Sequence, residues 1–518
     1  MPALPGGLTT GLAWALSAWL AGGLLTLPLE TLIQPRGEGR TRPASAWVLQ
    51  FGLWTLAFNL LMLLSQRPVF AAGLGLAGAL VVVLVNNAKY RVLQETFLFS
   101  DFGLFSQAFR HPRLYLPFLD VRQALAGITA VGLSLYLGLW LEPALPIYTG
   151  WTAFLVLAAG GSIAGMLMIR IAGRAAPVPT LKPELDLSEL GLAASLWLYW
   201  RLERSQPPSP VKSPFQRSVG PGNIPDSVTQ DKLPHIVAVQ SESFFDARRL
   251  LDTVRPQILA HFECSARAGL RGHLDVPAWG ANTMRTEFGF LTGISANQLG
   301  VHQFNPYRRY VRQPIPSLAS FLRALGYRTI CIHPHPASFF SRDRVFPLLG
   351  FDNFIDVRHF DPQETCGPYI CDAAVTRAIG DLLADSDRPL FIFAITMENH
   401  GPLHLEQVAP GDTERLYTTP PADGFEDLTV YLRHLENADT MLDELTGILS
   451  RQPRDGLLCW FGDHVPSMPR VYANLGYTDG RTDYLIWRQG TGTTGRRDLA
   501  VEDLGAALID AAGLGTMG

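Results

Sequence analysis

Apolar residues gather in five long stretches within the first third of the chain. The stretches cover approximately Leu8–Ile33, Trp47–Leu64, Val69–Val85, Ala124–Trp140 and Tyr148–Ile171. Each reaches or approaches the roughly 20 residues that an α-helix needs to cross a bilayer. Helices this apolar would have no polar face to present to water, which argues against burial in a large soluble protein. The pattern therefore predicts a transmembrane domain of about five helices over residues 1–171.

Two further segments carry aromatic and charged residues side by side. Asn86–Asp120 mixes lysine, arginine and aspartate with several phenylalanines. This suits a helix lying in the membrane interface, although a solvated loop would have the same composition. Residues 172–232 are rich in proline, serine and charge, so we expect a linker there. Within it, the tryptophans and arginines of residues 190–202 fit a second interfacial helix.

After Leu233 the pattern changes to short apolar runs separated by amphipathic stretches. The runs are His235–Gln240, Arg328–His333, Leu390–Thr396 and Gly456–Gly462, and the clearest amphipathic stretches are Ser317–Leu325 and Leu428–Leu449. Strands that alternate with helices predict a mostly parallel sheet covered by helices. We therefore expect a C-terminal α/β domain over residues 233–518, with its site at the carboxyl ends of the strands.

Composition narrows the range of partners. The net charge of -4 is small for 518 residues, and no long lysine or arginine run occurs, which argues against a nucleic-acid-binding surface.

The five cysteines lack the paired spacing of a structural zinc site. Cys331 and Cys459 lie in apolar runs and are expected in the core. Cys366 and Cys371 flank a turn-like segment and could form a disulfide in an oxidising compartment.

Carboxylates and imidazoles follow every predicted strand. The residues at these exits are Glu242, His333, His400 and the pair Asp463 and His464. One such residue would usually be a solvated strand end. Four exits that all supply oxygen or imidazole donors favour a metal site instead.

The segment Gly280–Phe288, with the sequence GANTMRTEF, supplies a group that a metal could activate. It lies in a loop or at a helix N-terminus, where backbone N–H groups favour phosphate. A capping box or a plain turn would give the same local pattern. The hydroxyl of Thr283 is a poor nucleophile near neutral pH, and no Ser-His-Asp arrangement is visible in the sequence. A cation that stabilises the alkoxide would make it reactive.

The motifs SESFFD, NTMRTEF, HPHPASFFSRD, MENHGP and GDHVP occur in this order along the chain. Together with the apolar helices and the segment FSDFGLF, they resemble the lipoteichoic-acid-synthase-like, or phosphoglycerol transferase, branch of the alkaline phosphatase/sulfatase superfamily. The likeness covers most of the chain. It implies about five transmembrane helices followed by an extracytoplasmic α/β sulfatase-like catalytic domain.

The resemblance also implies roles for particular residues. Thr283 would be the nucleophile, four residues before Glu287 as in the family's TxxxEF motif. Glu242, Asp463 and His464 would share one divalent ion with the Thr283 oxygen, and in family members that ion is manganese or magnesium. A covalent phosphothreonine intermediate follows from this arrangement.

Three further residues would contact the substrate phosphate according to the same resemblance. Arg342 and a protonated His400 would hold the phosphate and offset its negative charge in the transition state. His333 would assist them.

The most specific expectation is a transfer reaction at the bacterial inner membrane, on its periplasmic side. Thr283 would take glycerol phosphate from phosphatidylglycerol and pass it to a hydroxyl of an envelope glycan, such as a periplasmic glucan. The alternative headgroup is phosphoethanolamine. Hydrolysis, with water as the acceptor, would use the same site.

Two other readings are weaker. Sulfate ester cleavage requires a Cys or Ser within CxPxR or SxPxR in sulfatases of this superfamily, and no such motif precedes Glu287. A catalytically dead membrane assembly or transport protein would be expected to have lost ligands, whereas all four are present.

Loop charges oppose the expected orientation. Basic residues follow the first span and lie between the third and fourth spans, and counting them would put both segments in the cytoplasm. With five spans, the catalytic domain would then face the cytoplasm as well. A sixth crossing at Leu190–Trp200 would restore export, but it is short. The resemblance favours the extracytoplasmic side.

Overall fold

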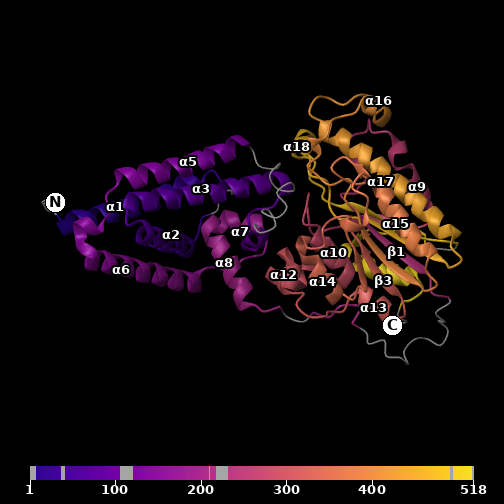
Figure 1. Ribbon diagram of the computed structural model, residues 1–518, viewed down its shortest axis with the longest axis horizontal. Coiled ribbons are helices and arrows are strands. Elements are labelled where there is room, and N and C mark those ends of the chain that lie inside the picture. The colour runs from indigo at the N-terminus through magenta and orange to yellow at the C-terminus, as the bar shows by residue number, and fades with distance from the viewer. Residues whose placement is uncertain are drawn as a thin grey trace. The chain divides into compact units, whose positions relative to one another are not determined.

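The chain folds into two compact units, residues 1–207 and 208–518 (Figure 1). The computed structural model describes residues 7–36, 41–104, 121–208, 211–216, 232–490 and 494–515. The first unit is helical, and the second is a mixed sheet with helices on both faces.

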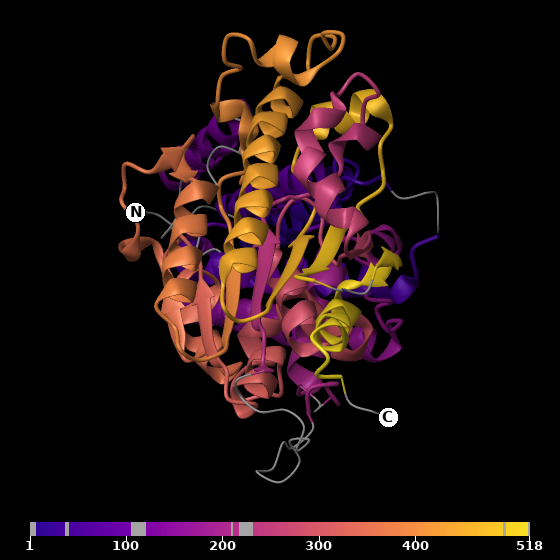
Figure 2. The ribbon, with the colours of Figure 1, turned by 90° about the vertical axis from the view of Figure 1, so that its right-hand side faces the viewer.

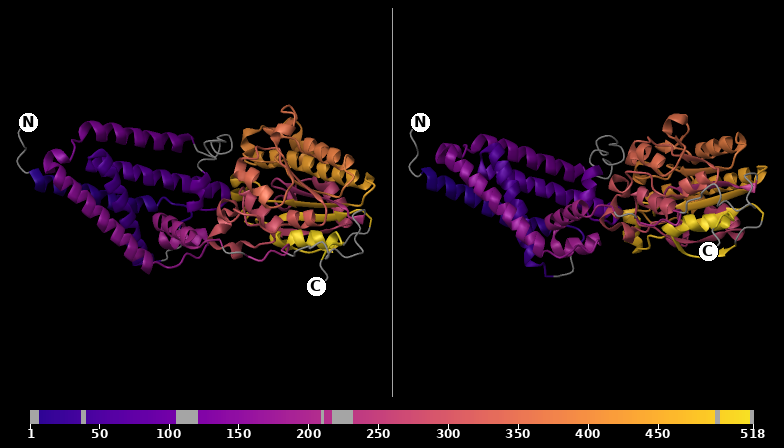
Figure 3. Two further views of the ribbon diagram at one scale, coloured as in Figure 1. Left: turned by 60° about the horizontal axis from the view of Figure 1, so that its bottom comes forward. Right: turned by 90° about the horizontal axis from the view of Figure 1, so that it is seen from below.

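Five long helices make up most of the first unit (Figure 3). They are α1 (Gly7–Glu30), α2 (Ala44–Ser65), α3 (Pro68–Leu93), α5 (Val121–Leu141) and α6 (Pro146–Ala175). Among the described residues, α1, α2, α3 and α6 are long and apolar enough to cross a membrane, whereas the apolar part of α5 runs only from Gly127 to Trp140. Each of the five predicted spans is thus a helix, and four of them qualify as membrane spans.

Small residues let the apolar helices approach closely. A Cβ added at Gly52 of α2 would lie 3.2 Å from the carbonyl oxygen of Gly165 of α6, and the reverse distance is the same. Lipid is as apolar as a leucine side chain, so membrane helices gain from such tight backbone packing rather than from hydrophobic burial. In addition, the indole N–H of Trp54 donates to the carbonyl oxygen of Trp19 at 2.9 Å and ties α2 to α1.

The segment expected as an interfacial helix over residues 86–120 begins inside α3. This helix continues to Leu93, and a short 3-10 helix, η1, follows at Phe99–Leu104. Lys89 of α3 reaches this segment and pairs with Asp101 at 2.7 Å. Residues 105–120 lie outside the described residues.

The segment expected as a linker over residues 172–232 contains two further helices, α7 (Pro183–Leu190) and α8 (Leu192–Ser205). Leu190, Ala194 and Leu198 pack with apolar residues of α2 and α6, so these helices belong to the first unit. The helix expected at 190–202 is therefore present as α8. At 14 residues it is shorter than a membrane crossing needs.

The second unit is built on a nine-stranded sheet. Its main order is β10-β2-β9-β8-β1-β7-β3-β4, with β11 paired to β2. The bounds are β1 (His235–Ser241), β2 (Leu270–Asp275), β3 (Arg328–Ile332), β4 (Asn353–Ile355), β7 (Leu390–Ile395), β8 (Gly456–Gly462), β9 (Thr482–Arg488), β10 (Gly495–Arg496) and β11 (Leu499–Ala500). The four predicted strands are confirmed as β1, β3, β7 and β8.

The central strands β8, β1, β7 and β3 are parallel, so their carboxyl ends share one edge. All residues of β1, β7 and β8 are buried, which explains why these strands are continuous apolar runs. Alternate residues of β1 serve two cores. Val237 and Val239 pack on one face, whereas Ile236 and Ala238 pack on the other.

Helices cover both faces of this sheet, and α17 crosses the face seen in Figure 2. The helices that pack on this face include α9 (Ala260–Arg267), α15 (Asp372–Ala384) and α17 (Glu426–Arg451). Those that pack on the opposite face include α10 (Thr283–Thr292), α13 (Leu318–Ala324), α14 (Arg342–Leu348) and α19 (Val501–Ala511). Short helices α11 (Ala296–Leu299), α12 (Pro306–Arg309), α16 (Asp412–Leu416) and α18 (Pro469–Leu475) and the hairpin of β5 (Thr365–Cys366) and β6 (Tyr369–Ile370) complete the unit. The two predicted amphipathic stretches are confirmed as α13 and α17.

Candidate active site

Two carboxylates and an imidazole meet where β1 and β8 end. Ser241 pairs with Gly462 in the parallel register, so Glu242 and Asp463 leave adjacent strands at the same level. Donor atoms of Glu242, Asp463 and His464 all lie within 4.8 Å of one another, and all three residues are buried. The predicted metal ligands of these two strands are therefore brought together.

Ser243 fixes the geometry of this cluster. Its backbone is left-handed, with a φ of 56°. Its N–H donates to Asp463 Oδ1 at 2.9 Å, and its hydroxyl donates to Glu242 Oε1 at 2.9 Å. The imidazole Nε2 of His464 lies 3.2 Å from Asp463 Oδ2 and 3.8 Å from Glu242 Oε1. This serine lies inside the SESFFD motif but was not among the predicted site residues.

Gly462 holds the two strand exits close together. A Cβ at this position would lie 1.8 Å from the carbonyl oxygen of Phe244. Only glycine permits this approach of the chain after β1 to the end of β8.

The cluster fits a divalent cation. Asp463 Oδ2 is buried and accepts no hydrogen bond from any described residue. Burial and, next, the charge of Asp463 raise the pKa of Glu242 to about 8. Two buried carboxylates this close need a counter-charge, and their oxygens together with an imidazole nitrogen suit Mg²⁺, Mn²⁺ or Zn²⁺.

Thr283 is the first residue of α10, and its side chain is buried. Asn282 enters the helix in a left-handed conformation, with a φ of 68°. On one side of Thr283, the N–H of Gly280 donates to the carbonyl oxygen of Val465 at 3.1 Å. On the other, the Thr286 hydroxyl donates to the carbonyl oxygen of Asp463 at 2.7 Å. Side chains three apart on a helix have Cβ atoms about 5–6 Å from each other, so Thr283 lies near the Asp463 segment.

Arg342 is held by Glu287 deep in the same unit and is only 1% exposed. Its Nε donates to Glu287 Oε2 at 3.1 Å, and its Nη2 donates to Glu287 Oε1. The hydroxyl of Tyr307 also donates to Glu287, at 3.1 Å. The TxxxEF glutamate therefore neutralises Arg342, a pairing that the sequence analysis did not foresee. One N–H of Nη2 and one of Nη1 are left for other partners.

His333 lies against Arg342 and is neutral. Its Nδ1 is 3.1 Å from the carbonyl oxygen of Ile395, so this nitrogen donates. The opposite nitrogen, Nε2, is 3.2 Å from Arg342 Nη1 and accepts from it. Burial, with the positive charge of Arg342, lowers the pKa of His333 well below its ordinary value. In this structure His333 positions the arginine.

His400 follows β7 and packs edge-on against Tyr369, with ring centroids 5.2 Å apart. Its Nδ1 lies 2.6 Å from the carbonyl oxygen of Gly401 and therefore donates. Burial lowers the pKa of His400. We therefore expect a neutral imidazole here, whereas the sequence analysis expected a protonated one.

A second buried acidic cluster, missed by the sequence analysis, centres on Glu398. Glu398 Oε1 lies 3.0 Å from His434 Nδ1 and accepts from Asn437, and Oε2 accepts from the N–H of Asp372. The other nitrogen of His434 contacts Glu406 at 3.0 Å. Burial opposes protonation of His434, but the bonds to the two glutamates prevail and raise its pKa to about 9. His434 lies inside an amphipathic helix, where the sequence pattern gives no sign of this role.

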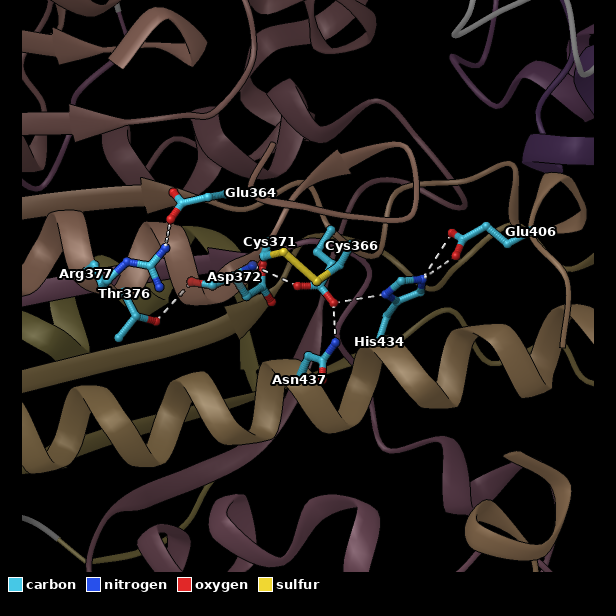
Figure 4. The surroundings of a disulfide bond; sticks show 10 residues. Glu364, Cys366, Cys371, Asp372, Thr376, Arg377, Glu406, His434 and Asn437 are labelled. Carbon is cyan, nitrogen blue, oxygen red and sulfur yellow. Dashed lines mark hydrogen bonds and ion pairs between the residues drawn. A yellow bond between two sulfur atoms is a disulfide. The ribbon is translucent and has the colours of Figure 1, made fainter. Parts of the chain in front are cut away.

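The Cys366–Cys371 disulfide lies beside this cluster (Figure 4). It closes the β5–β6 hairpin, with the two Cα atoms 5.0 Å apart. The disulfide considered in the sequence analysis is therefore present, and Cys331 and Cys459 are buried free cysteines as expected. The hairpin also carries Tyr369, so it connects the disulfide to His400.

Comparison with known proteins extends these observations. Over 259 residues the chain is 31% identical to the "Putative cyclic beta-1,2-glucan modification protein" of Rhizobium meliloti (strain 1021), covering 50% of this chain and 40% of that protein. It is 27% identical to the capsular polysaccharide biosynthesis protein RkpI of the same organism, covering 86% of this chain and 82% of that protein. The first alignment thus spans less than half of that relative's length.

The fold is shared along the whole chain with a solved membrane protein. The integral membrane protein lipooligosaccharide phosphoethanolamine transferase A (EptA) from Neisseria meningitidis superimposes with a TM-score of 0.55 and 14% identity, covering 99% of this chain and 96% of that one. This likeness shows the fold: apolar N-terminal helices followed by an α/β domain. The sequence profile of the sulfatase family matches residues 234–514, which contain every strand of the sheet. The chain therefore belongs to the sulfatase family, within the alkaline phosphatase superfamily that its motifs indicated.

Proposed function

We propose that this protein is a membrane-anchored, metal-dependent phosphotransferase that uses Thr283 as its nucleophile. The observation that carries the proposal is the meeting of Glu242, Asp463 and His464 at one edge of the sheet, next to the chain segment on which α10 is anchored. These three residues and the Thr283 oxygen would hold one divalent ion, which we propose to be Mn²⁺ or Mg²⁺. When bound, the ion supplies the positive charge that stabilises a threonine alkoxide.

The reaction would proceed in two displacements. The Thr283 oxygen forms a bond to the substrate phosphorus as the bond from phosphorus to the lipid oxygen breaks; the threonine loses its proton, and the departing diacylglycerol oxygen gains one. An acceptor hydroxyl then attacks the phosphothreonine, loses its own proton, and returns Thr283 to the hydroxyl form. Thr283 is the first residue of α10, and the unpaired N–H groups of a helix N-terminus favour phosphate.

Arg342, His333 and His400 would contact or orient the phosphoryl group. Arg342 already carries a carboxylate partner, so it would offer two fixed N–H donors rather than a full uncompensated charge. His333 would keep the guanidinium in place from behind. His400, as a neutral imidazole whose Nδ1 donates to Gly401, would accept a hydrogen bond through Nε2, for instance from the incoming acceptor hydroxyl.

We propose phosphatidylglycerol as the donor and an envelope glycan hydroxyl as the acceptor. The apolar helices support a lipid donor, because a tethered site meets lipids at high effective concentration. Relatives named for modifying a cyclic glucan and for making capsular polysaccharide support a glycan acceptor. The alternative headgroup, phosphoethanolamine, is favoured by the full-length fold shared with a phosphoethanolamine transferase.

The catalytic unit would face the extracytoplasmic side of the bacterial inner membrane. The Cys366–Cys371 disulfide supports this orientation, because disulfides persist in oxidising compartments. Cys264 is free and exposed on α9, so it offers a test without further substitution. A membrane-impermeant maleimide should label Cys264 in cells whose outer membrane has been permeabilised. Labelling only after disruption of the inner membrane would reverse the orientation.

Mass spectrometry of the Thr283 peptide tests the chemistry directly. The full chain is incubated with phosphatidylglycerol or phosphatidylethanolamine and Mn²⁺, and the mass added to Thr283 identifies the transferred headgroup. Thr283→Ala is the control that cannot form the adduct. If neither lipid modifies Thr283, and diacylglycerol release is the same in wild type and Thr283→Ala, the proposed function is wrong.

A further inference from the structure

A cavity in the first unit is lined by apolar and basic side chains, none of which takes part in the proposed reaction. It has a volume of about 890 Å³ and is lined by residues of α2, η1, α6 and α8. This volume is within the range of small-molecule sites, about 300–1,000 Å³. One part of its wall is apolar and the other carries positive charge.

Three arginines form the charged part. Arg170 and Arg174 lie one turn apart near the end of α6, so their side chains share one face of the helix. Both are exposed, and neither forms an ion pair with a described carboxylate. Arg201 of α8 is the third. No acidic residue is among the described residues that line the cavity, so its charge is uncompensated.

The position of Arg201 is fixed by the end of α6. Its Nη1 donates to the carbonyl oxygen of Gly173, one of the last carbonyls of the helix, which have no partner within the helix itself. The indole of Trp197 packs on the same glycine, where an added Cβ would lie 2.4 Å from the ring. A carbonyl is neutral, so this bond orients the guanidinium and leaves its positive charge available.

The rest of the wall suits a hydrocarbon chain. Leu53 of α2, Ile169 of α6 and Leu196 of α8 line it, and these side chains belong to a unit whose helices are long and apolar enough to cross a membrane. Trp197 and Trp200 stand beside the arginines. Tryptophan with arginine is typical of the level at which lipid headgroups meet the hydrocarbon region.

We infer that this cavity binds one anionic glycerophospholipid, with its phosphate against Arg170, Arg174 and Arg201 and an acyl chain along α2 and α6. A zwitterionic headgroup fits less well, because its own cation would meet three positive charges without a carboxylate to receive it. A peptide fits less well because the three arginines belong to a unit whose helices are long and apolar enough to cross a membrane. The apolar medium around such helices is lipid. The inference goes beyond the proposed function, since the site shares no residue with the Thr283 chemistry.

Native mass spectrometry of the full chain tests this site without catalysis. Delipidated Thr283→Ala protein is titrated with phosphatidylglycerol and, in parallel, with phosphatidylcholine of the same acyl chains. We expect one phosphatidylglycerol to be retained at concentrations at which phosphatidylcholine is lost. A basic residue near an anionic lipid contributes about 1 kcal/mol, or about five-fold in affinity, so Arg170→Gln with Arg174→Gln should weaken binding about 25-fold.

Matched variants separate the site from general charge effects. Arg170→Lys with Arg174→Lys keeps the charge and should bind within a few-fold of the parent protein. Arg91→Gln with Arg122→Gln removes two arginines of α3 and α5 that do not line the cavity, and should bind as the parent does.

Photocrosslinking gives a second readout that needs no arginine substitution. A phosphatidylglycerol with a diazirine in its headgroup should label peptides of α6 and α8 in the Thr283→Ala chain, which cannot take up the headgroup. The inference is overturned if phosphatidylcholine binds equally well, if the double glutamine variant binds like its parent, if a fatty acid of the same chain length binds as tightly, or if no label is found on α6 and α8. These results leave the Thr283 proposal untouched, because no outcome depends on transfer.

Discussion

Two buried acidic clusters follow neighbouring strands of the same sheet, and their charges are balanced differently. Where β1 and β8 end, Glu242 and Asp463 approach each other. Asp463 Oδ2 accepts no hydrogen bond from a described residue, and His464 Nε2, 3.2 Å away, pairs with it only when the imidazole is protonated. Behind β7, Glu398 receives bonds from the backbone, from Asn437 and from His434, which carries a positive charge. The buried Asp463 oxygen is left for a partner from outside the chain, whereas both oxygens of Glu398 have partners in the protein.

Whether a buried carboxylate has all its partners inside the protein distinguishes ligand-binding residues from structural ones better than the residue type does. Each cluster contains a buried glutamate and an imidazole. A buried carboxylate with all its partners in the protein stabilises the fold it belongs to, and a buried carboxylate with a missing partner indicates a ligand. We therefore predict that substitutions in the two clusters have opposite profiles, one affecting chemistry and the other stability.

The largest effect is expected for Glu242→Gln. The amide keeps the shape of the side chain but removes a charge that the cation requires, so formation of phosphothreonine should fall at least about a thousandfold, equivalent to about 4 kcal/mol. Mass spectrometry of the Thr283 peptide measures this, with circular dichroism as the check on folding. A rate within about tenfold of wild type would remove Glu242 from the site.

His434→Gln should act on stability instead. It leaves the buried Glu398 without its charged partner, which typically costs about 3–5 kcal/mol. The matched control is His261→Gln, because the imidazole of His261 pairs with Asp443 at the surface, where such a pair is worth about 0–1 kcal/mol. Thermal unfolding of the two variants in detergent makes the comparison, and equal shifts would mean that the second cluster is not structural.

The pH dependence of stability should reveal the same histidine. The folded protein raises the pKa of His434 from an ordinary 6.5 to about 9. The folded state therefore holds the proton more tightly, so its stabilisation is complete below about pH 6.5 and is lost as the pH rises through about 9. The shift corresponds to about 3 kcal/mol. Unfolding measured across this window should have a slope in wild type that His434→Gln lacks.

Divalent cations should stabilise the first cluster alone. At about 100 times its dissociation constant, a bound ion adds about 2.7 kcal/mol to the free energy of unfolding. Mn²⁺ should therefore raise the melting temperature of wild type and of His434→Gln, and a chelator should reverse the rise. Asp463→Asn should show no such response. A rise of the same size in Asp463→Asn would place the cation elsewhere.

The smallest effect concerns the disulfide beside the second cluster. Cys366 and Cys371 close a short loop, so replacing both with serine should cost about 2 kcal/mol. Transfer activity should change through His400, because Tyr369 of the same hairpin packs on its ring. Measuring KM and kcat separately distinguishes a displaced His400 from a loss of folded protein, because a loss of folded protein lowers the apparent kcat and leaves KM unchanged. Unchanged melting would show that the hairpin is held by its other contacts.

The sequence predicted the frame of the molecule well because its signals are local. Apolar stretches indicate membrane helices, and short apolar runs followed by Glu242 or Asp463 indicate buried parallel strands with polar exits. Parallel pairing then brings those exits together. The linker was harder to predict, since residues 183–205 become helices of the first unit only through contacts with α2 and α6.

Pairings between distant residues could not be read in the same way. Glu287 and Arg342 are 55 positions apart, and their bond depends on how α10 and α14 meet on the sheet. Likewise, His434 meets Glu398 only because α17 covers the end of β7. Burial lowers the pKa of His400, and the motif likeness that suggests a phosphate-binding role carries no information about this effect.

Gly462 has a consequence for the choice of metal. With the Phe244 carbonyl only 1.8 Å from where a side chain would begin, the strand exits bearing Glu242 and Asp463 are held at a set backbone separation. The opening between the two carboxylates is then governed by the main chain and can hardly widen or narrow to suit ions of different radius. Lengthening one ligand, as in Asp463→Glu, should consequently change which cation is preferred rather than being absorbed by movement of the loops.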